Sequence, residues 1–276
     1  MFNVTANGAD IPALGFGVFR VDAGDTRRMV KHVLDIGYRH IDTAQAYNNE
    51  ADVGEGITAS GVARADIFLT TKVWVKNFRH ANFLKSVDDS LGKLQTDYVD
   101  LLLLHWPNND VPLAEQIGAL NEVRQKGQTR HIGVSNYNRA LIAEAVKLSA
   151  APLVTNQIEY HPYLDQTPVL DAARAAGMSV TAYYAMADGK VPQDAILQAI
   201  GKKYGKSAAQ VTLRWLIQQK GVVALSKTVS EARARENLAI FDFELSAEDM
   251  AAIHKLANPK GRIVSPLGLA PAWDAA

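Results

Sequence analysis

Four residues whose side chains can exchange protons follow three successive apolar segments of the chain. Asp42 ends the segment GYRHID, Lys72 ends IFLTTK, His105 ends DLLLLH, and Tyr47 lies five residues after Asp42. The first three are separated by 30 and 33 residues, which is close to the length of one strand and helix unit in a parallel barrel. Because the carboxyl ends of the strands meet at one rim of such a barrel, we expect these four side chains to meet there.

This combination of side chains suits the protonation of a carbonyl oxygen. We expect Asp42 to pair with Lys72 and keep the lysine charged, and we expect the ammonium to lower the pKa of Tyr47 from about 10, so that the phenol becomes a usable acid. Desolvation disfavours imidazolium, so His105 beside Trp106 should be neutral and able to orient a carbonyl through a hydrogen bond. The partner still missing is a nucleophile for the carbonyl carbon, and a bound hydride donor would supply it.

Each of these residues also has a purely structural interpretation. His105 by itself could be a core histidine, Asp42 and Lys72 could form an ion pair that closes one end of a barrel, and Tyr47 could be an exposed loop aromatic. The types and spacing of all four together favour a catalytic site. The chain contains no cysteine, which excludes thiolate metal sites and cysteine nucleophiles, and we expect no metal.

Short apolar runs alternate with longer amphipathic segments, which is typical of strand and helix units around a parallel sheet. Strands are expected at residues 13–16, 38–41, 67–71, 98–104, 131–135, 153–157, 179–183 and 221–225. Helices are expected at residues 25–36, 50–60, 80–94, 113–126, 139–149, 168–176, 207–219 and 231–240. Eight such units predict an α/β protein with a (β/α)8 TIM barrel. An N-terminal β-hairpin that turns at Asn7 and Gly8 should plug the bottom of the barrel, and a C-terminal loop and helix extension should follow from about residue 246.

An open doubly wound sheet is the alternative architecture for this alternation. Its dinucleotide fingerprint requires a third glycine after Gly15 and Gly17, but Arg20 stands at that position. The sequence therefore favours the closed barrel. Since no linker or change of composition divides the chain, we expect one domain over residues 1–276.

The composition is that of an ordinary globular protein. The 276 residues include 29 basic and 29 acidic side chains, and this balance gives no reason to expect a nucleic-acid or membrane partner. No apolar run approaches the roughly 18 residues that span a bilayer, and the N-terminal segment lacks the pattern of a secretion signal. We expect a cytoplasmic monomer whose partner is a small molecule.

The sequence resembles the aldo-keto reductase family over nearly its whole length. The fragments that carry the resemblance are GYRHIDTAQAYNNEADVG, TKVW, DYVDLLLLHWP, IGVSNY, TNQIEYHPYL and SKTVSEARAREN. Within the family it is most similar to the bacterial 2,5-diketo-D-gluconate reductases, whose members also reduce methylglyoxal. The resemblance implies NADPH-dependent reduction of aldehydes and ketones to alcohols, with small dicarbonyls such as these as substrates. It also implies that Asp42, Tyr47, Lys72 and His105 are the catalytic residues.

The resemblance further implies where NADPH or NADP+ binds. Ser135, Asn136 and Gln157 match the residues that bind the nicotinamide carboxamide, and Tyr183 matches the aromatic ring stacked under the nicotinamide. Gly17 is also expected to bind the cofactor. Without the resemblance, Tyr183 could equally be a core aromatic.

The adenosine end of the cofactor is matched by the late fragment SKTVSEARAREN. Lys227, Thr228 and Arg233 match contacts to the 2′-phosphate, and Glu236 and Asn237 match contacts to adenine. A structural alternative is that the cations are solvated surface charges.

Phe19, Trp74 and Trp106 are expected to line the substrate pocket, with the loop around Trp273 closing it. One departure from the family pattern is Val18, which replaces a common threonine and removes one potential hydrogen bond to the cofactor.

Two other functions remain open on the same barrel. Lys72 could act as a Schiff-base nucleophile in an aldolase-type lyase, although pairing with Asp42 would keep it protonated and unreactive. The barrel could also serve as a non-catalytic nicotinamide-nucleotide sensor, and the complete set of four catalytic residues argues against this.

Overall fold

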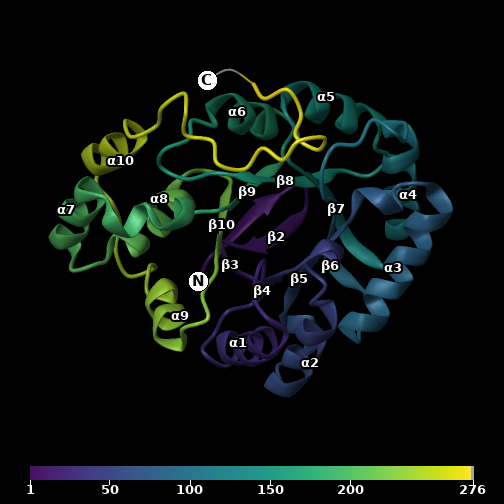
Figure 1. The fold of residues 1–276 in the computed structure, drawn as a ribbon, viewed down its shortest axis with the longest axis horizontal. Coiled ribbons are helices and arrows are strands. Elements are labelled where there is room, and N and C mark those ends of the chain that lie inside the picture. The colour runs from purple at the N-terminus through teal and green to yellow at the C-terminus, as the bar shows by residue number, and fades with distance from the viewer. Residues whose placement is uncertain (275–276) are drawn as a thin grey trace.

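The structure is a computed structural model that describes residues 1–274, and its centre is a closed barrel of eight parallel strands. Around the barrel the strands follow the order β10-β3-β4-β5-β6-β7-β8-β9. Their bounds are β3 Leu14–Gly17, β4 His40–Asp42, β5 Phe68–Val73, β6 Val99–Leu104, β7 Thr129–Ser135, β8 Leu153–Glu159, β9 Ser179–Tyr183 and β10 Val222–Ser226. Figure 1 shows the helices outside the strands. The expected (β/α)8 barrel is confirmed.

The helices of the described chain lie around the barrel, and most of them bury one side. They are α1 Ala23–Asp35, α2 Glu50–Ser60, α3 His80–Leu94, α4 Leu113–Gln125, α5 Arg139–Leu148, α6 Thr167–Ala175, α7 Ala195–Tyr204, α8 Ala208–Gln218, α9 Glu231–Leu238 and α10 Ala247–His254. In α1, for example, Met29, Val30 and Val33 are buried, and this spacing of three and four residues places them on one face. None of the helices within residues 1–274 is both long and apolar enough to cross a membrane.

Helix α7 is an addition to the expected pattern, which had only one helix between the seventh and eighth strands. The Asp194 side chain caps its first turn by accepting hydrogen bonds from Ile196 and Leu197. Gly205 ends it at φ 64°, a left-handed conformation that glycine adopts without a steric penalty. Ser207 then begins α8 with a capping box. The predicted helix at 207–219 is therefore the second of a pair.

The N-terminal hairpin lies at the barrel end opposite the expected active site, as predicted. Strands β1 (Asn3–Ala6) and β2 (Ala9–Pro12) pair in antiparallel fashion, and Figure 1 shows them within the ring of helices. In the turn, Asn7 Nδ2 donates to the carbonyl oxygen of Leu153, the first residue of β8, at 2.7 Å. Ile11 is fully buried, so the hairpin closes the N-terminal end of the barrel.

The alternation of side chains along β6 explains why its leucine run ends on a histidine. Lys72 of β5 pairs with Leu103 of β6, and neighbouring residues in a sheet point to the same face. Because the Lys72 ammonium lies inside the barrel with Asp42, Leu101 and Leu103 face inward as well. The next inward position is His105, which follows the last residue of β6 at the open rim.

Candidate active site

The Lys72 ammonium lies at the centre of the expected catalytic group. Its Nζ is 2.6 Å from Asp42 Oδ1, 2.8 Å from the Thr43 carbonyl oxygen and 3.3 Å from the Tyr47 hydroxyl. Three acceptors thus match the three N–H donors of an ammonium group. Lys72 is fully buried, and burial lowers its pKa while the Asp42 carboxylate opposes that shift. The expected ion pair between Asp42 and Lys72 is present.

Tyr47 reaches this cluster from the 3-10 turn η1 (Gln45–Tyr47), which leaves strand β4. Burial of the phenol, reinforced by the charge of Asp42, raises the pKa of Tyr47 well above 10. The expectation that Lys72 lowers this pKa is therefore wrong. The free-energy cost of removing a phenolate from water exceeds the stabilisation that the nearby ammonium provides. The Asp42 carboxylate adds to this cost, because it repels the phenolate. Tyr47 consequently remains protonated at neutral pH and is available as a hydrogen-bond donor.

His105 lies against two aromatic rings at the rim. Its ring centroid is 5.6 Å from that of Tyr47 and 5.2 Å from that of Trp74, with both pairs arranged edge to face. Burial, followed by the charge of Lys72, lowers the pKa of His105 well below 6.5. The expectation of a neutral imidazole is confirmed. Among the described residues, nothing forms a hydrogen bond with the buried Nδ1 atom.

The side chains expected to bind nicotinamide form a connected network beside the catalytic group. Gln157 Nε2 donates to Asp42 Oδ2 at 2.7 Å, and Tyr183 OH donates to Asn136 Oδ1 at 2.6 Å. Ser135 Oγ donates to the Gln157 carbonyl oxygen at 2.8 Å. Ser135, Gln157 and Tyr183 lie within the last three residues of β7, β8 and β9, and Asn136 directly follows β7.

Two further contacts join this network to the other expected residues. Asn136 Nδ2 donates to the His105 carbonyl oxygen at 3.0 Å, and Gly17 of β3 pairs with Asp42 of β4. The expected nicotinamide residues and the four expected catalytic residues therefore share one rim of the barrel.

The late cluster of expected cofactor residues lies at the end of β10 and on α9. Lys227 and Arg233 are exposed, and within residues 1–274 neither side chain forms a hydrogen bond or an ion pair with another residue. The loop between them is held by Arg28, which donates to the Val229 carbonyl oxygen and to Glu231, both at 2.9 Å.

The remaining members of this cluster are held by local structure. Ser230 caps the first turn of α9 by accepting a hydrogen bond from the Arg233 N–H, and the Thr228 hydroxyl accepts one from the Ser230 N–H at 3.0 Å. Asn237 is buried, whereas Glu236 is exposed on α9. Lys227 and Arg233, which have no partner within residues 1–274, therefore flank the N-terminus of α9, where the backbone dipole also favours an anion.

Aromatic side chains surround the opening above the catalytic group. The Phe19 ring lies 5.0 Å from that of Tyr47, and the Trp106 ring lies 6.4 Å from that of Trp273 in the C-terminal segment. The guanidinium of Arg262 lies over the Trp273 ring, with its Cζ atom 3.7 Å from the ring centroid. The C-terminal segment therefore contacts a residue of the expected substrate pocket.

Glu159 holds the C-terminal segment in place, although it is not among the residues that the sequence predicts for the site. This buried carboxylate at the end of β8 accepts hydrogen bonds from the N–H groups of Ile263 at 2.7 Å and Val264 at 2.9 Å. Its position at a strand end, in the fragment TNQIEYHPYL, is the signal that could have identified it. Its partners lie 104 and 105 residues away, beyond the reach of a local pattern.

The arrangement as a whole can supply a proton and an orienting hydrogen bond to the same oxygen atom of a small molecule. Tyr47 is a protonated phenol beside an ammonium, and His105 is a neutral imidazole beside Tyr47. In the part of the chain that the structure describes, no group of three or more acidic or histidine side chains could hold a metal ion. A phenol and an imidazole placed in this way are groups suited to acid catalysis and hydrogen bonding.

Comparisons with known proteins agree with this geometry. The sequence profile of the Aldo/keto reductase family matches residues 13–258. The methylglyoxal reductase DkgB of Salmonella typhimurium is 43% identical over 267 residues, covering 96% of this chain and 99% of that protein. The glyoxal reductase of Bacillus subtilis is 41% identical over 251 residues, covering 91% of this chain and 90% of that protein. A crystal structure assigned by name to 2,5-diketo-D-gluconic acid reductase B is 63% identical, with a TM-score of 0.99, and covers 100% of this chain and 98% of that one. The chain is therefore an oxidoreductase that belongs to the aldo-keto reductase family.

Proposed function

We propose that this protein reduces small dicarbonyl compounds, such as methylglyoxal or 2,5-diketo-D-gluconate, with NADPH and acts as a single-domain monomer. The observation that carries the proposal is the Tyr47 hydroxyl, 3.3 Å from the Lys72 ammonium and beside the neutral ring of His105. The names of the relatives support the substrate class, because they refer to methylglyoxal, glyoxal and 2,5-diketo-D-gluconic acid.

In the proposed reaction the chain positions the carbonyl oxygen and supplies its proton. His105 donates a hydrogen bond to the oxygen and orients it toward Tyr47. The Tyr47 O–H bond breaks as the new O–H bond of the alcohol forms, and the phenolate left behind is stabilised by the Lys72 ammonium. A nicotinamide held by Asn136, Gln157 and Tyr183 would supply the hydride that the carbonyl carbon accepts. Tyr47 then recovers a proton from solvent, which completes the balance of one hydride and one proton added per carbonyl.

The raised pKa of Tyr47 is compatible with this role. An alkoxide is a much stronger base than a phenolate, so proton transfer from Tyr47 to the developing alkoxide remains favourable. The raised pKa also keeps the proton on Tyr47 until charge develops on the substrate oxygen. Lys72 therefore contributes mainly after the proton leaves, when it faces a phenolate at hydrogen-bond distance.

The residues at the rim fit a nicotinamide nucleotide. Asn136 and Gln157 provide the amide donors and acceptors that a carboxamide requires, after exchanging their present partners Tyr183 and Asp42. Lys227 and Arg233 are exposed cations without an acidic partner in the described chain, which suits the extra phosphate that distinguishes NADPH from NADH.

The geometry gives no support to a Schiff-base lyase. Lys72 is fully buried, and all three of its N–H donors face acceptors, so the nitrogen has no free lone pair directed at a substrate. A nucleotide sensor would not need a protonated phenol beside an ammonium.

A substrate panel with NADPH tests the proposal, and Tyr47→Phe tests its mechanism. Small dicarbonyls, sugars and aromatic aldehydes would be compared by the loss of NADPH absorbance, with small dicarbonyls expected to give the highest kcat/KM. Tyr47→Phe should lower kcat by about 10²–10⁴, the range for general acid catalysis, and leave NADPH affinity nearly unchanged. Absence of turnover with every carbonyl would contradict the function, and near-normal turnover by the variant would remove Tyr47 from the mechanism.

A further inference from the structure

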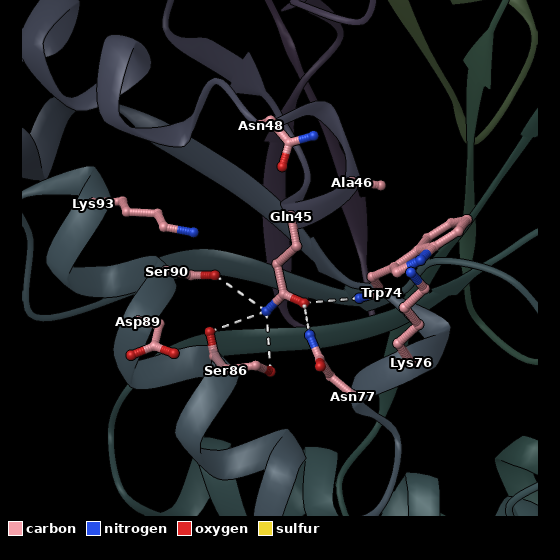
Figure 2. Close-up of a pocket in the computed structure, with 10 residues that line it drawn as sticks. All are labelled: Gln45, Ala46, Asn48, Trp74, Lys76, Asn77, Ser86, Asp89, Ser90 and Lys93. Carbon is pink, nitrogen blue, oxygen red and sulfur yellow. Dashed lines mark hydrogen bonds between the residues drawn. The ribbon is translucent and has the colours of Figure 1, made fainter.

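Gln45 lies at the centre of a polar cluster that the proposed reaction does not use directly. Its side chain borders a cavity of about 360 Å³, and Figure 2 shows the residues that line it. The amide nitrogen Nε2 donates to the carbonyl and hydroxyl oxygens of Ser86 and to the Ser90 hydroxyl, each at 3.1 Å. The amide oxygen Oε1 accepts from the backbone N–H of Trp74 and from Asn77 Nδ2, each at 2.9 Å.

These contacts join three separate elements. Gln45 begins the turn that carries Tyr47, whereas Trp74 directly precedes the 3-10 turn η3 (Val75–Asn77) that follows β5. Ser86 lies on helix α3. In Figure 2 the Gln45 amide points from its turn toward α3 on one side and toward η3 on the other. One side chain therefore connects both rim loops to the same helix.

The two loops joined in this way carry the two aromatic neighbours of His105. The rings of Tyr47 and Trp74 each lie edge to face against the His105 ring, at 5.6 and 5.2 Å. A movement of either loop would change the distance between the phenol and the imidazole, or the wall against which the imidazole rests. The distance between the two loops therefore affects how the Tyr47 hydroxyl and the His105 ring are placed around the carbonyl oxygen of a substrate.

The backbone of the Tyr47 turn does not provide this connection by itself. Its hydrogen bonds from Tyr47 N–H to Ala44 O at 3.0 Å and from Asn48 N–H to Gln45 O at 3.3 Å remain within the turn. On the opposite side, Asn49 donates to the Val18 carbonyl oxygen at 3.0 Å. In the described chain, Gln45 supplies the hydrogen bonds that link this turn to α3 and η3.

We propose that Gln45 is a positioning residue for carbonyl reduction: its side-chain amide fixes the Tyr47 turn relative to the Trp74 loop and so aligns the proton donor with His105. This inference rests on the proposed reductase function. A glutamine suits the position because one planar group must both donate to Ser86 and Ser90 and accept from Trp74 and Asn77. Ionised glutamate offers no donor, and the shorter asparagine lacks one methylene of reach.

The first test compares Gln45→Met with Lys76→Met. Methionine has nearly the length of glutamine but cannot form these hydrogen bonds, and Lys76 lines the same cavity without a polar contact to another described residue. Because a misplacement of about 1 Å can cost about 10²-fold, we expect Gln45→Met to lower kcat by about 10- to 100-fold. KM should rise more for an aromatic aldehyde, which would contact Trp74, than for methylglyoxal. NADPH affinity should not change, and Lys76→Met should behave like the wild type.

A conservative variant separates positioning from a general loss of packing. In Gln45→Glu, a protonated carboxyl keeps an acceptor and one donor, whereas the ionised form would face the Ser86 carbonyl oxygen without a donor. The charged groups that line the cavity are Lys76 on η3 and Asp89 and Lys93 on α3, and buried Glu50 lies behind Ser90. The kcat of Gln45→Glu relative to wild type should be highest at low pH and fall as the introduced carboxyl ionises. Gln45→Met should show no such recovery.

The outcomes distinguish this inference from the proposed function. If the wild type reduces carbonyls and Gln45→Met matches Lys76→Met in kcat, the positioning role is overturned while the function stands. Equal losses of kcat and NADPH affinity, or a lower Tm with unchanged kcat, would also overturn it. If the wild type reduces no carbonyl, the function fails, and crystal structures of wild type and Gln45→Met decide the positioning role. A shifted Tyr47 turn and Trp74 loop would support it, and unchanged positions would overturn it.

Discussion

Replacing Lys72 with methionine removes the ammonium from beside the Tyr47 hydroxyl and keeps an unbranched side chain of similar length. When Tyr47 loses its proton, a negative charge forms 3.3 Å from Nζ in the wild type. At an effective dielectric constant of about 20, two unit charges at this distance attract each other by about 5 kcal/mol. If about half of that charge has developed in the transition state, the variant loses about 2.5 kcal/mol of stabilisation, which lowers kcat about 70-fold.

A loss of stability must be separated from this loss of catalysis. Lys72→Met leaves the Asp42 carboxylate buried with one remaining side-chain donor, Gln157 Nε2 at 2.7 Å. Breaking a buried ion pair in this way costs about 3–5 kcal/mol of folding stability. The double variant Asp42→Asn, Lys72→Met removes both charges and should recover much of this stability. Its kcat should remain as low as that of Lys72→Met, because the ammonium is absent from both.

The pH dependence of kcat provides the sharpest assay. In the wild type the pKa of Lys72 is lowered from 10.5 and the pKa of Tyr47 is raised above 10, so the ammonium should lose its proton first. We therefore expect kcat for reduction to fall at alkaline pH with an apparent pKa below 10.5, a property of the coupled pair. Lys72→Met should lack this alkaline fall. A Lys72→Met variant with the kcat of the wild type would refute the electrostatic role of Lys72. A substrate adduct trapped by borohydride on Lys72 of the wild type would refute the inference that this lysine is protonated.

Three further perturbations test other parts of the site and the fold. His105→Leu should fold normally, since leucine suits a buried strand end, but lose kcat/KM; a lower Tm with little change in kcat/KM would indicate a structural histidine instead. Arg233→Ala and Lys227→Ala should each weaken NADPH binding by at least about 10-fold, the lower end for a charge-assisted hydrogen bond because both side chains are exposed. NADH binding should be nearly unaffected, and equal losses with both cofactors would contradict the assigned phosphate contacts. Burial lowers the pKa of His40 from 6.5 to about 4. The protein should therefore have its full folding stability above pH 6.5 and lose stability as the pH falls toward 4, because the unfolded chain takes up the proton first. The loss should reach about 3 kcal/mol. Urea unfolding across this range should show the loss, and His40→Leu should reduce the slope; an unchanged slope would count against the buried neutral histidine.

The strand pattern is the part of the fold that the sequence predicts best. All eight barrel strands overlap their expected ranges, because each is a short buried run that ends near a turn or a polar residue. Helix α7 was not predictable by the same signal. Only Leu197, Ile200 and Gly201 are buried along it, so its apolar pattern is short, and its packing against α8 depends on how the chain turns at Gly205.

The sequence by itself determined that Asp42, Lys72 and His105 reach one rim, because parallel strands joined by helices must all end on the same side of a barrel. It did not determine the protonation of Tyr47, whose pKa moves opposite to expectation. That direction depends on how much water the folded chain excludes from the phenol and on how Asp42 is placed relative to Lys72. The partners of Gln45 were likewise decided by the tertiary structure, since they lie 29 to 45 residues away along the chain. Spacing along a sequence fixes which strand end a residue occupies, whereas desolvation and hydrogen bonding between loops depend on distances that exist only after the barrel closes.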